Sequence, residues 1–235
     1  MKSWQEDFLG ATDGAQCEHA VFRKIEAGAR ALGFEHCAYR VHVAQPFSSP
    51  EAIVLNNYTA PWWVRYISEG YLHVDATVPH GRRTQTPLNW SDKVSGSARQ
   101  LRGEARRFGL RVGWTQSSLV AMGVAGMLTL SRSHETPFMM ELASQEVKLR
   151  WLVNVSHLIL SGILTSRQRE KIQLTVREIE VLRWSADGKT SGEISAILAV
   201  SESTVNFHMK NAVAKLQTAN KTSAVARAAS LGLLN

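Results

Sequence analysis

The chain has 235 residues, of which 44% are hydrophobic and 20% charged, and its formal net charge is +7 at pH 7. This composition excludes a disordered chain, because it supplies enough apolar surface to bury a core. Domains cluster near ~100 to 150 residues, so the length predicts two of them. The positive charge favours polyanionic partners without separating nucleic acid from a membrane surface.

The two cysteines, Cys17 and Cys37, show neither CxxC spacing nor a neighbouring histidine cluster, so no disulfide framework or zinc site is predicted. The segment MKSWQEDFLGATDG lacks the apolar core of a signal peptide, and no apolar run reaches the ~18 residues of a membrane span. We therefore expect a cytoplasmic protein without a membrane partner.

The first half of the chain predicts helices and antiparallel strands. Apolar residues recur at helical spacing over 18–32, and Gly33 is placed to end that helix. Strands over 36–43 and 52–55 flank a turn at 46–50. A basic helix over 99–108, stopped at Gly109, precedes strands over 112–120 and 127–131, which the turn AMGVAG joins.

An apolar stripe then predicts a long helix over about 137–164. At least four strands among helices predict the α+β class, with an N-terminal α/β/α sandwich built on an antiparallel sheet. The polar segment SRQREKIQ is the best candidate for a linker. The expected domains are therefore 1–165 and 174–235, joined by a linker over 166–173.

The second half of the chain predicts helices only. Thr175 with Glu178 and Thr190 with Glu193 have the spacing of capping boxes, and Ser201 is placed to cap a third helix after a short turn. This order predicts a helix-turn-helix, in which the third helix, TVNFHMKNAVAKL, enters the major groove. The same amphipathic pattern also fits a purely structural helix of a small bundle.

The third helix resembles DNA-reading helices in more than its periodicity. The segment from Leu174 to Leu216 is similar, motif by motif, to the LuxR-type helix-turn-helix, at Glu178, Trp184, Gly188, Lys189, Thr190, Glu193, Ile194, Leu198, Ser201, Thr204, Val205, His208, Asn211, Lys215 and Leu216. The resemblance implies an all-α, four-helix DNA-binding domain. Its last helix, 223–231, either takes part in dimerisation or closes the domain's own core.

On the third helix, Val205, Ala212 and Leu216 are expected to face the core. A single helix-turn-helix reads one half-site, so a homodimer on an inverted repeat of double-stranded DNA is expected, with RNA polymerase as a further partner. The candidate DNA-contacting residues are Lys189, Thr190, Ser201, Ser203, Thr204, Asn206 and Lys210, of which Asn206 and Lys210 are the candidates for reading bases.

The aromatic residues Tyr58, Trp62 and Tyr66 recur every four residues and would share one helix face. Such a stripe fits an ordinary core as well as a binding site. With Asp75, Trp90, Gly113 and Thr129, however, the spacing is similar to that of the acyl-homoserine lactone receptors of the LuxR family. The resemblance then extends over most of the chain.

This resemblance implies a role for each candidate residue in binding an acyl-homoserine lactone, a ligand and not a cofactor. Asp75 would accept the ligand's amide N–H, and Trp62 would donate to the lactone carbonyl. The hydroxyls of Tyr58 and Thr129 would approach the amide carbonyl, while Tyr66 and Trp90 would form walls. Without ligand we expect Asp75 to be left unpaired, so that ligand stabilises the fold.

The sequence departs from the family pattern at Ala76, Trp63 and Arg40. Arg40 is expected to face solvent, although a shortened acyl pocket or a preference for an oxidised tail would also explain it. The leading hypothesis is a quorum-sensing transcription factor. The alternative is an unpaired regulator that answers a foreign or non-lactone signal.

An enzyme acting on the same ligand is not expected. The eight histidines form no HxxxH pair beside carboxylates, no G-x-S-x-G motif occurs, and neither cysteine has an evident catalytic partner.

Overall fold

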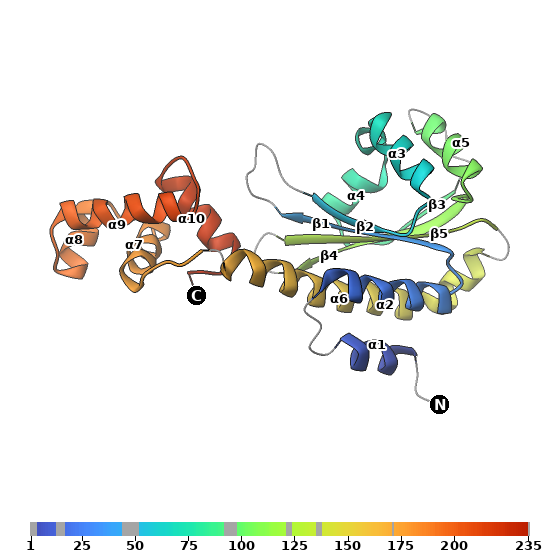
Figure 1. Cartoon of the computed structure of the whole chain (residues 1–235), viewed down its shortest axis with the longest axis horizontal. Helices are drawn as coiled ribbons and strands as arrows, with labels where there is room; N and C mark the ends of the chain where they lie inside the picture. Colours follow the sequence, from blue (N-terminus) through green and yellow to red (C-terminus); the bar gives the residue numbers. More distant parts are fainter. Residues whose placement is uncertain are drawn as a thin grey trace. The chain divides into compact units, whose positions relative to one another are not determined.

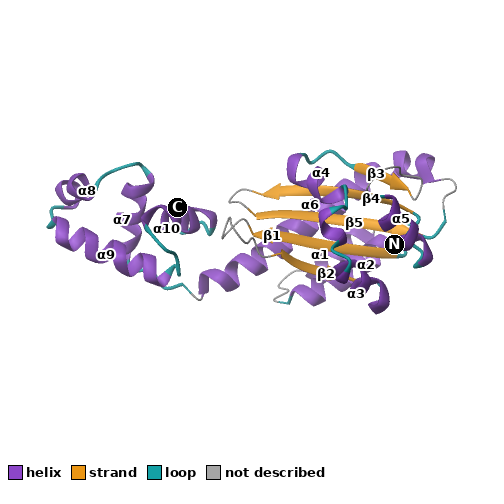
Figure 2. Ribbon diagram, turned by 90° about the horizontal axis from the view of Figure 1, so that it is seen from above, coloured by secondary structure: helices purple, strands orange, loops and turns teal. Residues whose placement is uncertain are grey.

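The computed structural model describes residues 4–12, 17–43, 52–91, 98–120, 124–134, 138–170 and 172–234. Its N-terminal part is built on a five-stranded antiparallel sheet with the strand order β2-β1-β5-β4-β3, and Figure 2 shows these strands side by side. The strands are β1 (His36–Val43), β2 (Ala52–Asn56), β3 (Leu88–Ser91), β4 (Val112–Val120) and β5 (Val124–Arg132).

Helices cover both faces of this sheet, which confirms the α/β/α sandwich (Figure 1). One layer contains α2 (Glu18–Ala31) and α6 (Phe138–Glu170), with α1 (Trp4–Thr12) packed outside it. The ring of Phe8 on α1 lies 5.6 Å from that of Trp151 on α6, in an edge-to-face arrangement. The other layer contains α3 (Ala60–Ser68), α4 (Thr77–Arg83) and α5 (Arg99–Arg107).

Because side chains alternate along a strand, each strand directs one set of side chains to each of the two helical layers. On β1, the side chains of Cys37, Tyr39 and Val41 are buried with at most 1% exposure, and the hydroxyl of Tyr39 bonds to Nδ1 of His157 on α6 at 2.6 Å. Successive strand residues point to opposite faces. Ala38 and Arg40 therefore point to the layer of α3, α4 and α5.

Several predicted elements are confirmed, whereas α1, β3 and α4 were not predicted. Antiparallel pairing of β1 with β2 and of β4 with β5 agrees with the expected strands, and Gly33 and Gly109 follow α2 and α5 with left-handed φ of 83° and 82°. Strand β3 was missed because it has only four residues. Helix α4 was missed because Pro79 and Gly81 lie within it. The predicted turn over 46–50 and residues 121–123 of the predicted turn over 121–126 lie outside the described residues, whereas 124–126 belong to β5.

Helix α6 is longer than the sequence indicated, since it continues through 166–170, where a linker was expected. Its stretch Leu142–Leu164 has the length and composition of a membrane span, although the sequence analysis found none. Leu149, Leu152, Val153 and Leu160 on this stretch have 0% exposure within the folded chain. These side chains form the core under the sheet, as expected for the central helix of a globular domain.

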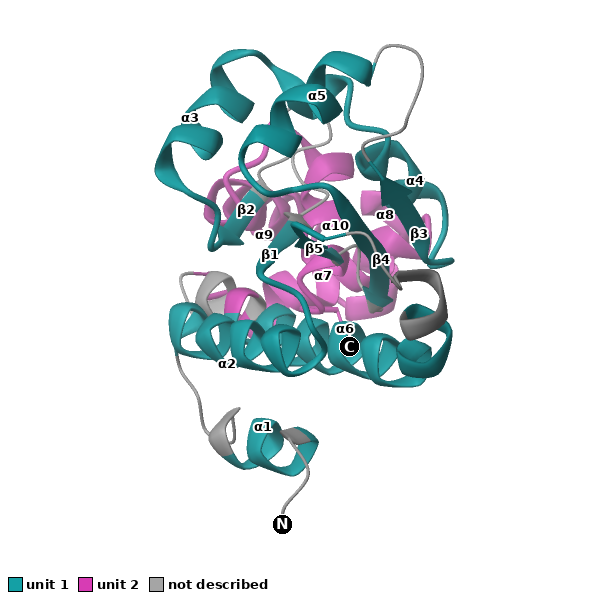
Figure 3. Cartoon of the chain, turned by 90° about the vertical axis from the view of Figure 1, so that its right-hand side faces the viewer, with its two compact units in different colours: residues 1–42, 52–120, 124–163 teal, residues 43–51, 121–123, 164–235 magenta. Residues whose placement is uncertain are grey.

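The chain divides into two compact units, coloured separately in Figure 3. The first contains 1–42, 52–120 and 124–163, and the second contains 164–235 together with 43–51 and 121–123. In the second unit the four-helix region predicted from the sequence is present: α7 (Val176–Ala186), α8 (Ser191–Leu198), α9 (Glu202–Lys215) and α10 (Lys221–Ser230).

The caps predicted for these helices are formed. Both hydrogen bonds of a capping box are present at Thr175 with Glu178 and at Thr190 with Glu193, and the Ser201 hydroxyl accepts from the Thr204 amide. Val205, Ala212 and Leu216 are buried as expected, with Met209 beside them. Ala224 and Ala228 of α10 have 0% exposure in the same core, so this face of α10 closes the domain's own core.

Candidate ligand cavity and DNA-binding surface

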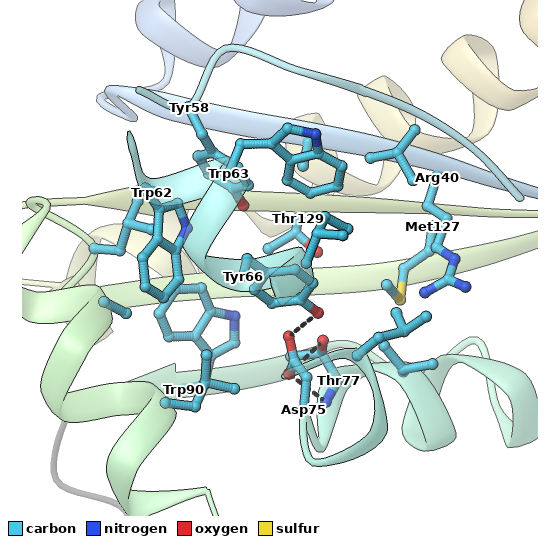
Figure 4. Close-up of a pocket in the computed structure, with 18 of the residues that line it drawn as sticks. Arg40, Tyr58, Trp62, Trp63, Tyr66, Asp75, Thr77, Trp90, Met127 and Thr129 are labelled. Carbon is cyan, nitrogen blue, oxygen red and sulfur yellow. Dashed lines mark hydrogen bonds between the residues drawn. The ribbon is translucent and has the colours of Figure 1, made fainter. Parts of the chain in front are cut away.

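A cavity of about 340 Å³ lies in the first unit, lined by residues of β1, β2, β3 and β5, of the β2–α3 connection and of the helical layer α3–α5. The structure places all six predicted ligand-binding residues in its lining: Tyr58, Trp62, Tyr66, Asp75, Trp90 and Thr129. Figure 4 shows Trp62 and Trp90 at one end, Arg40 and Met127 at the other, and Asp75 with Tyr66 between them. The sequence had placed Tyr58 on a helix, but it precedes α3, which begins at Ala60.

Aromatic rings form the wall around Trp62, whose side chain is only 3% exposed. Its ring centroid lies 5.3 Å from that of Phe108, 6.2 Å from Tyr71 and 6.0 Å from Tyr66. Trp63 stacks on Tyr66, with 5.8 Å between centroids and an interplanar angle of 8°. These contacts give the cavity a rigid apolar end.

The carboxylate of Asp75 is already hydrogen-bonded in this ligand-free structure. Its Oδ1 accepts from the amide and the hydroxyl of Thr77, at 3.0 and 2.8 Å, and faces the guanidinium of Arg102 at 3.4 Å. Its Oδ2 accepts from the Tyr66 hydroxyl at 3.1 Å. The expectation that Asp75 is unpaired without ligand is therefore wrong, because the protein supplies a cation and three neutral donors.

The contribution of Arg102 was missed, since the sequence offered it only as part of a basic helix. It is 5% exposed, shares the buried face of α5 with Leu101 and Ala105, and lies with its guanidinium carbon 4.2 Å from the centroid of the Trp90 ring. This contact combines a cation–π interaction with the ion pair to Asp75. The shared helix face with Leu101 and Ala105 is the signal that could have revealed Arg102.

A chain of hydroxyl groups runs from Trp90 toward the cavity. The Trp90 indole N–H donates to the Thr115 hydroxyl at 3.0 Å, and that hydroxyl donates to the Thr129 hydroxyl at 3.2 Å. An indole N–H can only donate, so the Thr115 hydroxyl must accept from Trp90 and is free to donate its own hydrogen to Thr129. The proton of Thr129 is thereby left for an acceptor in the cavity.

Two further donors face the cavity without a partner among the described residues. No described residue accepts from the indole N–H of Trp62 or from the hydroxyl of Tyr58. Burial, followed by the nearby Asp75 carboxylate, raises the pKa of Tyr58, so this hydroxyl keeps its proton. Trp62, Tyr58 and Thr129 thus offer neutral donors to the cavity, and Oδ2 of Asp75 keeps acceptor capacity.

The helices over the cavity are joined by Arg65 of α3 and Glu104 of α5. Nε and Nη2 of Arg65 donate to the two carboxylate oxygens of Glu104, each at 2.9 Å. Hydrogen bonding by Arg65 lowers the pKa of Glu104 to about 2. The pair therefore remains ionised throughout the physiological pH range.

The expectation that Arg40 faces solvent is wrong. Arg40 is half-buried, lines the cavity beside Met127, and extends from β1 into the layer of helices (Figure 4). The alternation along β1 explains the error. The side chains of Arg40 and Ala38 lie on the face of the sheet that the layer of α3, α4 and α5 covers. Since Ala38 and Arg40 alternate with the apolar Cys37, Tyr39 and Val41, this orientation was readable in the sequence.

The predicted DNA-contacting residues gather on α9 and at the start of α8. Ser203, Asn206 and Lys210 are exposed, and Phe207 is 60% exposed, on the side of α9 away from Val205, Met209, Ala212 and Leu216. The Asn206 side-chain carbonyl accepts from the Ser191 hydroxyl at 2.8 Å. Asn206 is thus held in place across the helix pair, with its amide group still able to donate.

The remaining candidates surround two helix N-termini. Thr190 is the N-cap of α8 and Ser201 that of α9, and the hydroxyl of Ser201 also bonds to that of Thr204 at 2.7 Å. The Lys189 ammonium lies 4.0 Å from the Glu193 carboxylate. Helix N-termini attract anions through their free amides and dipole, so this surface suits phosphate groups.

An ion pair fixes α9 against α7. Lys215 donates to Glu178 at 2.8 Å, and Glu178 is itself 2% exposed. Burial by itself would raise the pKa of Glu178, but hydrogen bonds from Lys215 and from the Thr175 amide outweigh it, and the pKa falls below the ordinary value. The ionised carboxylate therefore supports the helix that carries the DNA-contacting candidates.

A sandwich domain with a mostly apolar cavity that carries several polar groups, followed by a helix-turn-helix domain, is the architecture of a ligand-responsive transcription regulator. The chain matches the autoinducer binding domain over residues 18–160 and the bacterial regulatory proteins of the luxR family over residues 172–228. It belongs to the LuxR family of autoinducer-binding transcriptional regulators. It is a quorum-sensing regulator and not an enzyme.

Similar proteins match the chain over its full length. It is 41% identical over 238 residues to the transcriptional activator protein AnoR of Acinetobacter nosocomialis, covering 100% of both chains. It is 37% identical over 236 residues to the quorum-sensing regulator RhlR of Pseudomonas aeruginosa, covering 98% of this chain and 96% of that one.

Two solved structures of SdiA have the same fold. The crystal structure of Escherichia coli SdiA superposes with a TM-score of 0.83 at 32% identity, covering 99% of this chain and 98% of that one. SdiA in complex with octanoyl-rac-glycerol gives a TM-score of 0.82 at 32% identity, covering 100% and 99%.

Proposed function

We propose that this regulator binds an acyl-homoserine lactone in its N-terminal cavity and, as a homodimer in the cytoplasm, binds an inverted-repeat promoter site and contacts RNA polymerase. In this proposal residues 1–165 form the ligand domain and 174–235 the DNA-binding domain, with 166–173 between them. Ligand and DNA are bound by separate domains, so the signal acts through the dimer.

The observation that carries the ligand proposal is a set of polar groups placed inside a mostly apolar cavity. Trp62, Tyr58 and Thr129 supply donors, and Asp75 supplies an acceptor. An acyl-homoserine lactone has two carbonyl acceptors and one amide donor, and buried polar atoms need partners. We assign the lactone carbonyl to Trp62, the amide N–H to Asp75 and the amide carbonyl to Tyr58 and Thr129, with Tyr66 and Trp90 as walls.

The test is mass spectrometry of small molecules released from the protein after expression in the presence of its native cell extract. We expect a lactone to be retained at about one equivalent. Adding the same lactone at a hundredfold excess over its Kd should raise the unfolding free energy by about 2.7 kcal/mol. Superimposable melting curves with and without the retained lactone would overturn the proposal.

A non-lactone signal is the second candidate, favoured by the structure of the similar SdiA with octanoyl-rac-glycerol. An acyl glycerol has hydroxyl and ester groups that can also engage Asp75 and Trp62. A panel that contains lactones and acyl glycerols of matched chain length separates the two. Retention of an acyl glycerol without any lactone would establish this second candidate in place of the first.

For the DNA site we propose that Lys189, Thr190, Ser201, Ser203 and Thr204 contact phosphates and that Asn206 and Lys210 reach base edges. Support comes from their gathering around two helix N-termini and the exposed side of α9. The dimer is tested with a selected inverted repeat against the same DNA with one half-site scrambled. Equal affinity for the two DNAs would contradict a dimer on an inverted repeat.

A further inference from the structure

The end of the cavity away from Trp62 is bounded by a charged side chain. Arg40 of β1 lies opposite Val54 of β2 in the sheet register, and the side chains of both line the cavity. Met127 of β5 and Val78 of α4 complete this end. In the proposed binding mode the ligand's acyl portion points here, because Asp75 separates this end from the Trp62 end (Figure 4).

Among the described residues, none forms an ion pair or a hydrogen bond with the guanidinium of Arg40. The nearest candidate, Asp75, is already paired with Arg102 and hydrogen-bonded by Thr77 and Tyr66. Burial, the largest influence, lowers the pKa of Arg40, and Arg82 on α4 also lowers it, while Tyr66 and Asp75 partly oppose the shift. A guanidinium nevertheless remains protonated in proteins.

Arg40 also limits the length of the cavity. A second hollow of about 30 Å³ lies next to the main cavity, and both are lined by Arg40, Val78 and Met127. The second hollow is also lined by Gly81, Ser117 and Gly126. A ligand that fills the main cavity therefore ends against the Arg40 side chain. A fully apolar acyl chain in this position would desolvate the guanidinium without offering it a partner, which is unfavourable.

We infer that Arg40 makes the acyl end of the cavity a polar subsite, selective for ligands whose acyl portion carries an oxygen acceptor. This inference rests on the proposed function for the position of the acyl chain. The acceptor is a carbonyl, hydroxyl or carboxylate oxygen, which receives a hydrogen bond from the guanidinium. An unsubstituted chain of the same length binds less tightly.

The test compares ligands of one chain length on the purified full-length protein by calorimetry. The ligands are hexanoyl-homoserine lactone, its 3-oxo and 3-hydroxy forms, and a form whose chain ends in a carboxylate. We expect at least one oxygenated ligand to bind about tenfold more tightly than the unsubstituted one, as for one hydrogen bond to a charged group. The ligand that gains most identifies where along the chain the acceptor lies.

The variant Arg40→Met keeps a side chain of similar length and removes the charge. It is expected to bind the oxygenated and the unsubstituted ligands equally, whereas Arg40→Lys retains part of the difference. Arg83→Met removes an exposed arginine of α4 outside the cavity lining and should behave as the unmodified protein. Melting curves check that each variant is folded.

The inference is overturned if the unmodified protein binds the unsubstituted ligand as tightly as every oxygenated one, or if Arg40→Met keeps the preference. Failure of all four lactones to bind instead contradicts a lactone with an acyl chain of this length. The same comparison made with octanoyl glycerol and its 3-hydroxyoctanoyl counterpart then tests Arg40 independently. Loss of the preference in Arg40→Met with those ligands supports the subsite.

Discussion

The indole N–H of Trp90 and the hydroxyl of Thr115 form a buried hydrogen bond of 3.0 Å. Because the Thr115 hydroxyl accepts in that bond, it donates its own hydrogen to the hydroxyl of Thr129. Thr115 is 0% exposed and is not part of the cavity lining. A residue outside the cavity lining thus sets which way a cavity hydroxyl points.

We expect Thr115→Val to destabilise the N-terminal domain by about 1–3 kcal/mol, because the buried Trp90 N–H loses its acceptor. Ligand affinity should fall as well, since Thr129 is no longer oriented. Urea unfolding and calorimetry measure the two effects. Thr115→Ser keeps the hydroxyl and should retain affinity, and a similar loss in both variants would argue against orientation of Thr129.

Gly113 allows Trp90 to lie against β4. A methyl group at this position would overlap the Trp90 ring and the carbonyl oxygen of Leu130. Gly113→Ala should therefore lower the unfolding free energy by about 1–3 kcal/mol and weaken ligand binding. Gly103→Ala, on α5 with open space around it, is the control and should leave stability unchanged or raise it slightly. Equal effects of the two changes would contradict this account.

The Glu178–Lys215 pair predicts a pH dependence of the DNA-binding domain. The folded-state pKa of Glu178 lies below its ordinary value of 4.5, so its stabilisation is present above pH 4.5 and is lost as the pH falls through the folded value. We expect Glu178→Gln to lower stability by about 1–3 kcal/mol at pH 7. Hydrogen exchange in α7 and α9 measures this, and a difference that persists at a pH below the folded-state pKa of Glu178 would exclude the ion pair as its cause.

Lys210 is exposed on α9 and is expected to contact DNA through its charge. Lys210→Ala should weaken binding and reduce the slope of log affinity against log salt by about one unit for each bound subunit. Lys24→Ala, on the exposed side of α2, removes the same charge from the ligand domain and serves as control. An unchanged slope for Lys210→Ala counts against the contact.

Phe207 is the large apolar residue that α9 exposes, whereas Met209 of the same helix is 9% exposed. Phe207→Ser should leave the unfolding free energy within about 0.5 kcal/mol, yet weaken operator binding about tenfold. Met209→Ala should show the reverse, losing about 2–5 kcal/mol of stability. If the Phe207 ring contacts thymine methyl groups, replacing operator thymines by uracil should lower the operator affinity of proteins that retain Phe207 and leave that of Phe207→Ser unchanged.

The sequence predicted the C-terminal domain better than the ligand domain, and the reason is the range of the interactions involved. Helix starts there are marked by local caps. The side chains of Thr175, Thr190 and Ser201 each accept a hydrogen bond from the backbone amide three residues later. The cavity instead depends on pairs such as Arg102 with Asp75 and Thr115 with Trp90, at separations of 27 and 25 residues. Such pairs depend on strand register and helix placement, which no local spacing reveals.

Arg40 shows a different kind of error. The alternation of Arg40 with buried residues indicates which face of the sheet it occupies, whereas its charge alone favours exposure to solvent. A cavity can nevertheless accept the head of a long polar side chain. The short strand β3 and the proline-containing α4 were missed because their local patterns are weak and their positions are decided by packing.

The cavity occupies the space between sheet and helices where a domain without a ligand would place core side chains. Part of the hydrophobic core is therefore supplied from outside the chain. We expect the regulator's abundance to follow its signal, because newly made chains that find no ligand expose this incomplete core to proteases for longer. The signal would then set how many copies exist before any of them meets a promoter.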